Sequence, residues 1–199
     1  MNRIPTVLLS LSLALAVLTG GLIWYVSDHF VSSEGSPTAS AMVLGGPFKL
    51  IDQDGAVRTD RDFHGKFVLL YFGYSFCPDV CPTTLGVMSD ALSKLDGKAQ
   101  RIVPVFVTVD PERDTPAALK KYLAAFGPRF MGLTGTVPQV KKMAHEYGVY
   151  FAKHPIEGGG YGVDHSSVVY LLGPDGKLVT FYDEQMTPDT LAKDLATRT

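Results

Sequence analysis

The chain has 199 residues, of which 46% are hydrophobic and 19% are charged, and its formal net charge at pH 7 is −2. This length fits one globular domain with a sizeable core. Lysine and arginine form no basic block, so the composition excludes the basic surface that nucleic-acid-binding proteins use.

A stretch without a charged residue runs from Val7 to Val26. A helix of this length, rising about 1.5 Å per residue, spans roughly 30 Å, the hydrocarbon core of a bilayer. Trp24 and Tyr25 lie where an interfacial aromatic belt is expected. A cleaved signal peptide is the alternative, but the one neat small-x-small cleavage sequence lies too far downstream. We therefore predict that residues 1–26 form an uncleaved, N-terminal transmembrane helix.

The flanking charges predict the orientation of this anchor. Arg3 and the α-amino group precede it, whereas Asp28 and Glu34 follow it, and positive groups favour the cytoplasmic side. Because no Arg- and Ser-rich transit peptide precedes the anchor, we predict a single-pass protein of the bacterial inner membrane. Its C-terminal domain is expected to face the oxidising periplasm. Residues 27–46, rich in Ser, Gly, Ala and Pro, are predicted to form a flexible tether.

The pattern of a mixed α/β domain begins at residue 47. A hairpin with Gly55 at its turn is predicted first. Two near-continuous apolar runs, Lys66–Tyr74 and Ile102–Val109, then predict strands buried on both faces of a parallel sheet. A helix is predicted between them, because four apolar residues fall on one helical face: Leu85, Met88, Leu92 and Leu95. Together these elements make a βαβ unit.

Further helices are predicted from Pro116 and from about Val137. Strands over residues 167–172 and 178–182 flank a Gly-Pro-Asp-Gly turn, and a last helix is predicted from Pro188. A βαβ unit followed by a hairpin and a terminal helix is the layout of a thioredoxin-like domain. We therefore predict an α/β, thioredoxin-like fold for residues 47–199.

The two cysteines, Cys77 and Cys81, follow the first buried strand and are separated by three residues. Pro82 is predicted to open the next helix with Cys81 as its cap, which places both sulfurs at a helix N-terminus, where thiolate is favoured. A structural disulfide is the commonest use of two cysteines in a secreted protein. A redox pair is the second reading, although the familiar dithiol motif has two intervening residues. A shared metal ion is the third.

A metal held by two sulfurs needs a third ligand, and the chain has five histidines. His29, His64 and His145 are expected in solvent, and His154 has no convergent partner. His165 ends a glycine-rich segment, expected to be a mobile loop, and precedes a strand whose entrance lies beside the thiol-bearing helix in a thioredoxin-like fold. Its position fits a ligand and a hydrogen-bonded turn histidine equally well. Two thiolates and an imidazole would suit copper(I) or zinc, with copper favoured at an accessible three-coordinate site.

Three long motifs resemble the signatures of the Sco/SenC family and occur in the order of that family. They are Tyr71–Leu85, Val107–Pro116 and Val163–Tyr170. The resemblance covers the chain from about Pro47 to the last helix. Members of this family are membrane-tethered, thioredoxin-like copper proteins that help to assemble the binuclear copper centre of cytochrome c oxidase.

The resemblance implies that Cys77, Cys81 and His165 are ligands of copper, as Cu(I) or Cu(II). Asp110 and Asp114 match an acidic motif of the family, for which it implies partner contact or loop support. Their alternative role is to end a strand and cap the helix that follows.

One departure from the family pattern is Phe76, where many relatives have a histidine. The phenylalanine removes an auxiliary ligand or proton donor, a change that bears on the redox behaviour of the neighbouring thiols more than on their copper binding.

The leading hypothesis is a metallochaperone that delivers copper to the copper-bearing subunit of cytochrome c oxidase. Other periplasmic copper chaperones or thiol reductants are expected as further partners, and nucleic acid is not. The alternative is a thiol-disulfide reductase that keeps the oxidase cysteines reduced, with Cys77 and Cys81 as its redox-active pair and no need for His165. A peroxidase is a weaker reading, because only Arg113 is near a motif, and a purely structural disulfide would bind no copper.

Overall fold

The computed structural model describes residues 19–25 and 44–199, and the chain divides into two units, Met1–Val43 and Leu44–Thr199. In the first unit residues 19–25 are helical, and the side chains of Leu22, Ile23, Trp24 and Tyr25 are exposed. Neither described range contains a helix that is long and apolar enough to cross a membrane. Most of the predicted anchor and tether lies outside the described residues.

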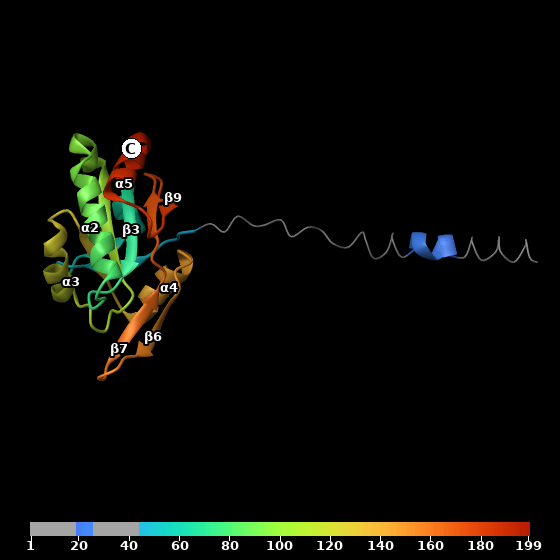
Figure 1. The fold of residues 1–199 in the computed structure, drawn as a ribbon, viewed down its shortest axis with the longest axis horizontal. Helices are drawn as coiled ribbons and strands as arrows, with labels where there is room; N and C mark the ends of the chain where they lie inside the picture. The colour runs from blue at the N-terminus through green and yellow to red at the C-terminus, as the bar shows by residue number, and fades with distance from the viewer. Residues whose placement is uncertain (1–18, 26–43) are drawn as a thin grey trace, which may run out of the picture. The chain divides into compact units, whose positions relative to one another are not determined.

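The second unit contains nine strands, four α-helices and three 3₁₀ helices (Figure 1). The strands are β1 (Lys49–Asp52), β2 (Val57–Thr59), β3 (Phe67–Gly73), β4 (Ile102–Thr108), β5 (Met131–Thr134), β6 (Phe151–Pro155), β7 (Tyr161–His165), β8 (Val169–Leu172) and β9 (Leu178–Tyr182). The α-helices are α2 (Val80–Ser93), α3 (Pro116–Leu123), α4 (Val137–Glu146) and α5 (Pro188–Arg198). The 3₁₀ helices are η1 (Asp60–Phe63), η2 (Asp96–Arg101) and η3 (Ala124–Phe126).

Seven strands form one sheet in the order β2-β1-β5-β4-β3-β8-β9, while β6 and β7 form a separate two-stranded sheet. β3 and β4 are parallel, and α2 connects them, which confirms the predicted βαβ unit. β8 pairs antiparallel with β3 on its other side and with β9 in a hairpin. With α5 packed against α2, this is the predicted thioredoxin-like arrangement.

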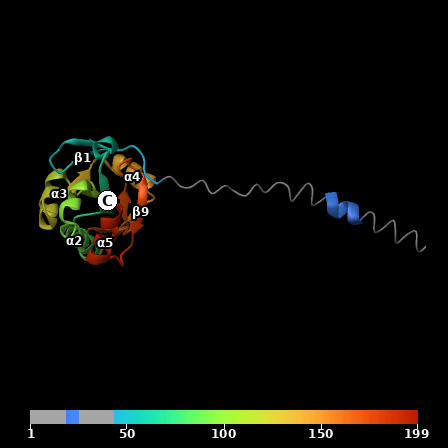
Figure 2. The ribbon, with the colours of Figure 1, turned by 90° about the horizontal axis from the view of Figure 1, so that it is seen from above.

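Adjacent residues of the central strands point to opposite faces of the sheet. Tyr71 lies against Cys81 of α2, whereas the ring of Phe72 lies 5.7 Å from that of Tyr147, which follows α4. Phe106 of β4 packs on Tyr122 of α3, again with 5.7 Å between ring centroids. Figure 2 accordingly shows α2, α3 and α5 on one side of the sheet and α4 on the other. All seven residues of β3 are buried, as expected for a strand covered on both faces.

Two elements differ from the prediction. The short strand β5 was not predicted, because its four residues are too few to show a period and include a glycine. The segment from Phe151 to His165 is a β-hairpin rather than the expected loop, with register pairs from Phe151↔His165 to Pro155↔Tyr161. Its glycines at 158–160 have φ of +86°, +96° and +86° and form the turn, because that conformation favours glycine.

Replacing Leu85 with Ala tests the packing of α2 on the sheet. Leu85 is fully buried, so we expect the free energy of unfolding to fall by about 2–5 kcal/mol. Asp90→Ala, on the exposed side of the same helix, is expected to change it by less than about 0.5 kcal/mol. Urea denaturation followed by circular dichroism measures both, and equal losses would show that Leu85 does not pack in the core.

Candidate metal centre

The side chains of Cys77, Cys81 and His165 converge at one end of the central strands. Their ligand atoms all lie within 4.8 Å of one another, and 3.3 Å separates Cys81 Sγ from His165 Nε2. Cys77 lies in the loop between β3 and α2, Cys81 in the first turn of α2, and His165 at the end of β7. Cys81 is buried, while Cys77 and His165 are half-buried, so solvent reaches these two residues more readily than Cys81.

The helix behind the thiols begins earlier than predicted. α2 starts at Val80 with Asp79 as its N-cap, so the expectation that Cys81 caps a helix opened by Pro82 was wrong. Pro82 is still accommodated in the first turn, where its missing N–H would have had no intrahelical acceptor. The Cys81 N–H donates to Cys77 Sγ at 3.4 Å, so this sulfur accepts from a free N–H of the first turn, as a capping side chain does.

The two thiols have very different acidities. The hydrogen bond from the Cys81 side chain, followed by backbone N–H groups at the helix start, lowers the pKa of Cys77 to about 5 despite partial burial. The same hydrogen bond to Cys77 and then burial raise the pKa of Cys81 far above its ordinary range. At neutral pH the pair is therefore one thiolate and one thiol, with Cys77 as the charged member.

The imidazole of His165 is held by three contacts. Its Nδ1 lies 3.1 Å from the Ser166 carbonyl oxygen, an acceptor, so Nδ1 donates to that oxygen and Nε2 is the nitrogen that faces the sulfurs. The rings of Tyr71 and Tyr74 stand edge-on to it, with centroids at 6.1 and 5.8 Å. With Nδ1 at a carbonyl oxygen, Nε2 is the nitrogen placed to act as a metal ligand.

Two residues of the β3 end shape the back of the cluster. The hydroxyl of Tyr71 donates to Cys81 Sγ at 3.8 Å. A Cβ atom on Gly73 would lie 2.8 Å from the same sulfur and 2.9 Å from Phe106, so any larger residue would displace the thiol. Sequence reasoning missed both residues, although they stand in the run that precedes the cysteines.

The other described histidines lie away from the cluster. His64 and His145 are exposed, as expected, and His154 is exposed on β6 with its Nδ1 3.2 Å from an Asp164 carboxylate oxygen. His29 lies outside the described residues. The position of His165 in the sequence fitted a ligand and a turn residue equally well. What distinguishes it from the other described histidines is that its side chain lies beside the two cysteine sulfurs.

The two aspartates of the second motif are fully buried and support loops. Asp114 accepts hydrogen bonds from the Ser75 N–H at 2.9 Å, from the Ser75 hydroxyl, and from the Thr108 hydroxyl at 2.6 Å. The cap of α3 is instead Thr115, whose hydroxyl accepts from the Ala118 N–H, so the capping role considered for Asp114 was wrong.

Asp110 is bound by three groups that sequence reasoning did not connect. Its carboxylate forms ion pairs with Arg113 and, at 3.8 Å, with Lys153, and it accepts a hydrogen bond from the Tyr161 hydroxyl at 2.9 Å. Since both aspartates lack exposed surface, support of the loops around the cluster explains them better than contact with a partner.

The pH dependence of alkylation tests the paired thiols. As pH rises through about 5, Cys77 changes from thiol to thiolate, so its rate of reaction with iodoacetamide is expected to rise there and level off before pH 7. Mass spectrometry of the modified peptide measures this rate. Cys81→Ala removes the side-chain donor that stabilises the Cys77 thiolate, so the midpoint of the rate curve is expected to move towards about 8.5. Cys81→Ser keeps a hydrogen-bond donor at this position, so its midpoint is expected to lie below that of Cys81→Ala. A wild-type midpoint near 8.5 would contradict the thiol–thiolate pair.

Replacing Asp114 with Ala separates loop support from capping. The change leaves three donors without their acceptor, and each buried unpartnered group costs roughly 1–3 kcal/mol, so we expect a loss of about 2–4 kcal/mol in unfolding free energy. Thr115→Ala removes the cap and is expected to cost about 1 kcal/mol. Urea denaturation compares the two variants, and a smaller loss for Asp114→Ala would contradict its supporting role.

Comparison with known proteins gives a consistent result. The SCO1/SenC family model matches residues 36–199. "Protein SCO1 homolog 2, mitochondrial" from Arabidopsis thaliana is 46% identical over 159 residues, which are 79% of this chain and 58% of that protein. This chain thus spans little more than half the length of the first curated relatives that it matches.

Solved structures resemble the second unit closely. The structure of Bradyrhizobium japonicum ScoI with copper bound is 42% identical, with a TM-score of 0.74, and the match covers 78% of this chain and 99% of that one. BsSco, described as a member of the Sco family of cytochrome c oxidase assembly proteins, is 28% identical, with a TM-score of 0.64 and coverage of 79% and 95%. The three motifs, the thioredoxin-like fold and these matches agree, and the chain belongs to the SCO1/SenC family.

Proposed function

We propose that this protein is a metallochaperone that binds copper through Cys77, Cys81 and His165 and delivers it to the copper-bearing subunit of cytochrome c oxidase. The observation that carries the proposal is the convergence of two sulfurs and one imidazole nitrogen within 4.8 Å. Solved relatives from Bradyrhizobium japonicum and Arabidopsis thaliana have copper bound, and BsSco belongs to a family of oxidase assembly proteins.

The donor set favours copper over other metals. Thiolate sulfur is a soft ligand that selects Cu(I), and an imidazole binds both Cu(I) and Cu(II). A structural zinc site would be closed by a fourth protein ligand, and the cluster among the described residues has three members. Cys77 is already ionised at neutral pH, so binding releases a proton mainly from Cys81.

The unequal burial of the ligands suits transfer. Cys77 and His165 are half-buried, whereas Cys81 is fully buried. Thiolates of a recipient can therefore replace the two outer ligands first and the inner sulfur last, so that copper keeps ligands throughout. Because binding requires both cysteines reduced, a thiol reductant is needed in an oxidising compartment.

The N-terminal region would keep the domain near its partner. We propose that residues 1–26 anchor the protein by one span in the bacterial inner membrane, that residues 27–46 form a tether, and that the domain of residues 47–199 faces the periplasm. The uncharged stretch from Val7 to Val26 and the exposed apolar side chains within residues 19–25 support this assignment. Tethering raises the effective concentration near a membrane-bound recipient.

A second candidate function is a thiol-disulfide reductase. The low pKa of the Cys77 thiol favours it, because the thiolate is the form that attacks disulfides. The Cys77 thiolate would attack a partner disulfide, forming a mixed disulfide and releasing one partner thiolate. Cys81 would then lose its proton and attack the Cys77 sulfur, releasing the second partner thiolate. The partner gains two electrons, and the protein is left with a Cys77–Cys81 disulfide.

Replacing His165 with Ala distinguishes these functions. We expect the affinity of the reduced protein for Cu(I) to fall by about 100-fold or more, since even outer-shell partners of a metal ligand account for about 10-fold to 100-fold. A competition titration with a chromophoric Cu(I) chelator measures this affinity. The rate at which the variant reduces a disulfide peptide is expected to stay within about threefold of wild type, because that chemistry needs only the cysteines.

His154→Ala is the matched control, because His154 lies on the same hairpin and is exposed. We expect wild-type Cu(I) affinity for it. Equal affinity in wild type and His165→Ala would remove His165 from the ligand set. Weak binding by wild type together with rapid peptide reduction would favour the reductase.

A further inference from the structure

The position of His165 relative to the thiols depends on side-chain contacts. The thiol loop continues from β3 of the main sheet, whereas His165 lies on β7, which pairs with β6 in a sheet of its own. In Figure 1 this hairpin extends away from the seven-stranded sheet. No ladder hydrogen bond between described strands joins the two sheets, so apart from the chain connection from His165 to β8 the hairpin is held to the thiol loop by side-chain contacts.

Arg113 contacts both segments. Its guanidinium carbon lies 4.7 Å from the ring centroid of Phe76, the residue directly before Cys77. The same carbon lies 3.8 Å from the ring centroid of Tyr161, the first residue of the strand that ends at His165. Arg113 Nη1 also donates to the Tyr161 carbonyl oxygen at 3.0 Å. One side chain therefore touches the residue next to a thiol and the strand that carries the imidazole.

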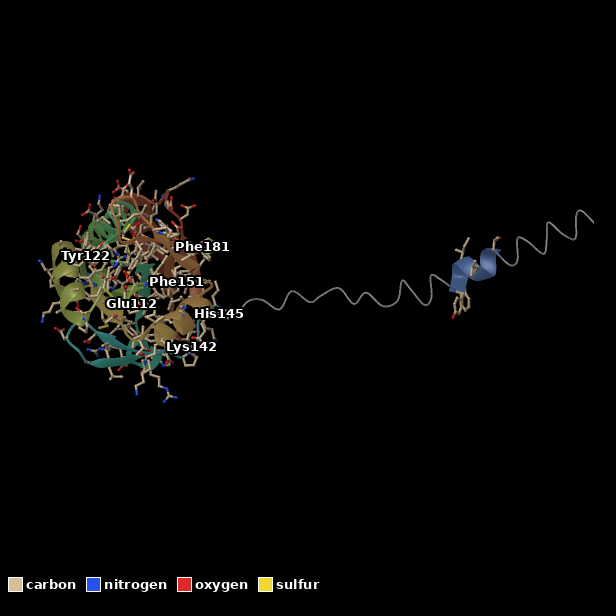
Figure 3. The ribbon with its side chains drawn as sticks, turned by 90° about the horizontal axis from the view of Figure 1, so that it is seen from below. Glu112, Tyr122, Lys142, His145, Phe151 and Phe181 are labelled. Carbon is tan, nitrogen blue, oxygen red and sulfur yellow. The ribbon has the colours of Figure 1, made fainter. Side chains whose placement is uncertain are left out.

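Arg113 is itself fixed to the body of the domain. Its Nε pairs with the fully buried carboxylate of Asp110, which also accepts from the Tyr161 hydroxyl at 2.9 Å. The loop that carries Arg113 is further joined to the hairpin by an ion pair between Glu112 and Lys153. Figure 3 looks onto this end of the domain, with Glu112 of the loop and Phe151 of β6 labelled near its middle.

The third guanidinium nitrogen of Arg113, Nη2, is buried and makes no hydrogen bond among the described residues. Leaving this buried N–H donor without an acceptor costs free energy. A site that served only to pair Arg113 with a carboxylate would be expected to give both terminal nitrogens an acceptor. What the guanidinium gains instead is contact with the faces of aromatic rings on two segments.

We propose that Arg113 is a positioning residue that clamps the β6–β7 hairpin to the thiol loop and so holds His165 Nε2 at the two sulfurs. The proposal rests on the metal-binding function proposed above. Arg113 does not touch the ligand atoms; it acts through Phe76 on one side and Tyr161 on the other. Its removal is expected to loosen the third ligand while leaving the thiol pair in place.

The test is a double-mutant cycle on the full-length, reduced protein in detergent micelles. Cu(I) competition titrations compare Arg113→Gln with wild type, and the double variant Arg113→Gln/His165→Ala with His165→Ala. We expect Arg113→Gln to weaken binding about 10-fold to 100-fold when His165 is present. In the His165→Ala background the same change is expected to have less than about a threefold effect, because the group that it positions is gone.

Arg58→Gln is the matched control. Arg58 pairs through Nε with the buried carboxylate of Asp52, as Arg113 does with Asp110, but it lies on the edge strand β2. We expect it to lower stability without changing Cu(I) affinity. If Arg113→Gln does not fold, Phe76→Leu removes one ring face at an exposed position and is expected to show the same dependence on His165, more weakly.

Hydrogen exchange of the copper-free protein gives a readout that does not need the metal. Amides of β7 are expected to exchange faster in Arg113→Gln and at the wild-type rate in Arg58→Gln. Equal loss of Cu(I) affinity in both His165 backgrounds, or unchanged β7 exchange, would overturn the clamp. If wild type binds no Cu(I), the proposed function fails, and the exchange rates of β7 alone decide whether Arg113 clamps the hairpin.

Discussion

The parallel pairing of β3 and β4 is the constraint on which the centre depends. Parallel strands bring their carboxyl ends to the same edge of a sheet, so the thiol loop after β3 and the aspartate loop after β4 meet there. β8 is antiparallel to β3, with Val169 opposite Tyr71, so its amino end lies at this edge too. The hairpin that ends at His165 leads into β8, and three segments distant in sequence thus converge.

The chemistry of the centre depends on the single proton that Cys77 and Cys81 share at the start of α2. Cys77 accepts from the Cys81 N–H and side chain and is ionised, while Cys81, buried against Tyr71 and Gly73, stays protonated. This asymmetry serves metal capture and disulfide exchange equally well. The third member of the centre is the imidazole of His165, whose Nε2 lies 3.3 Å from Cys81 Sγ and adds a nitrogen donor that a metal can use.

Much of the domain could be predicted because its local patterns agree with its tertiary contacts. The buried runs of β3 and β4 and the apolar face of α2 are visible as composition and period. Helices α3, α4 and α5 each begin at or near a proline after a threonine cap, a signal confined to a few residues. The β6–β7 hairpin was mistaken for a loop because its glycine-rich turn dominates a short, largely exposed segment.

The sequence by itself determined the thioredoxin-like order of elements, the thiol pair at a helix start and, through its three motifs, the family. It could not separate a ligand from a turn residue at His165, because position along the chain says nothing about where Nε2 points. Only the tertiary structure decided that Nε2 faces Cys81 Sγ, that Asp110 and Asp114 are buried, and that Arg113 lies between two rings. These are contacts between residues as far as 84 positions apart, and no local period encodes such contacts.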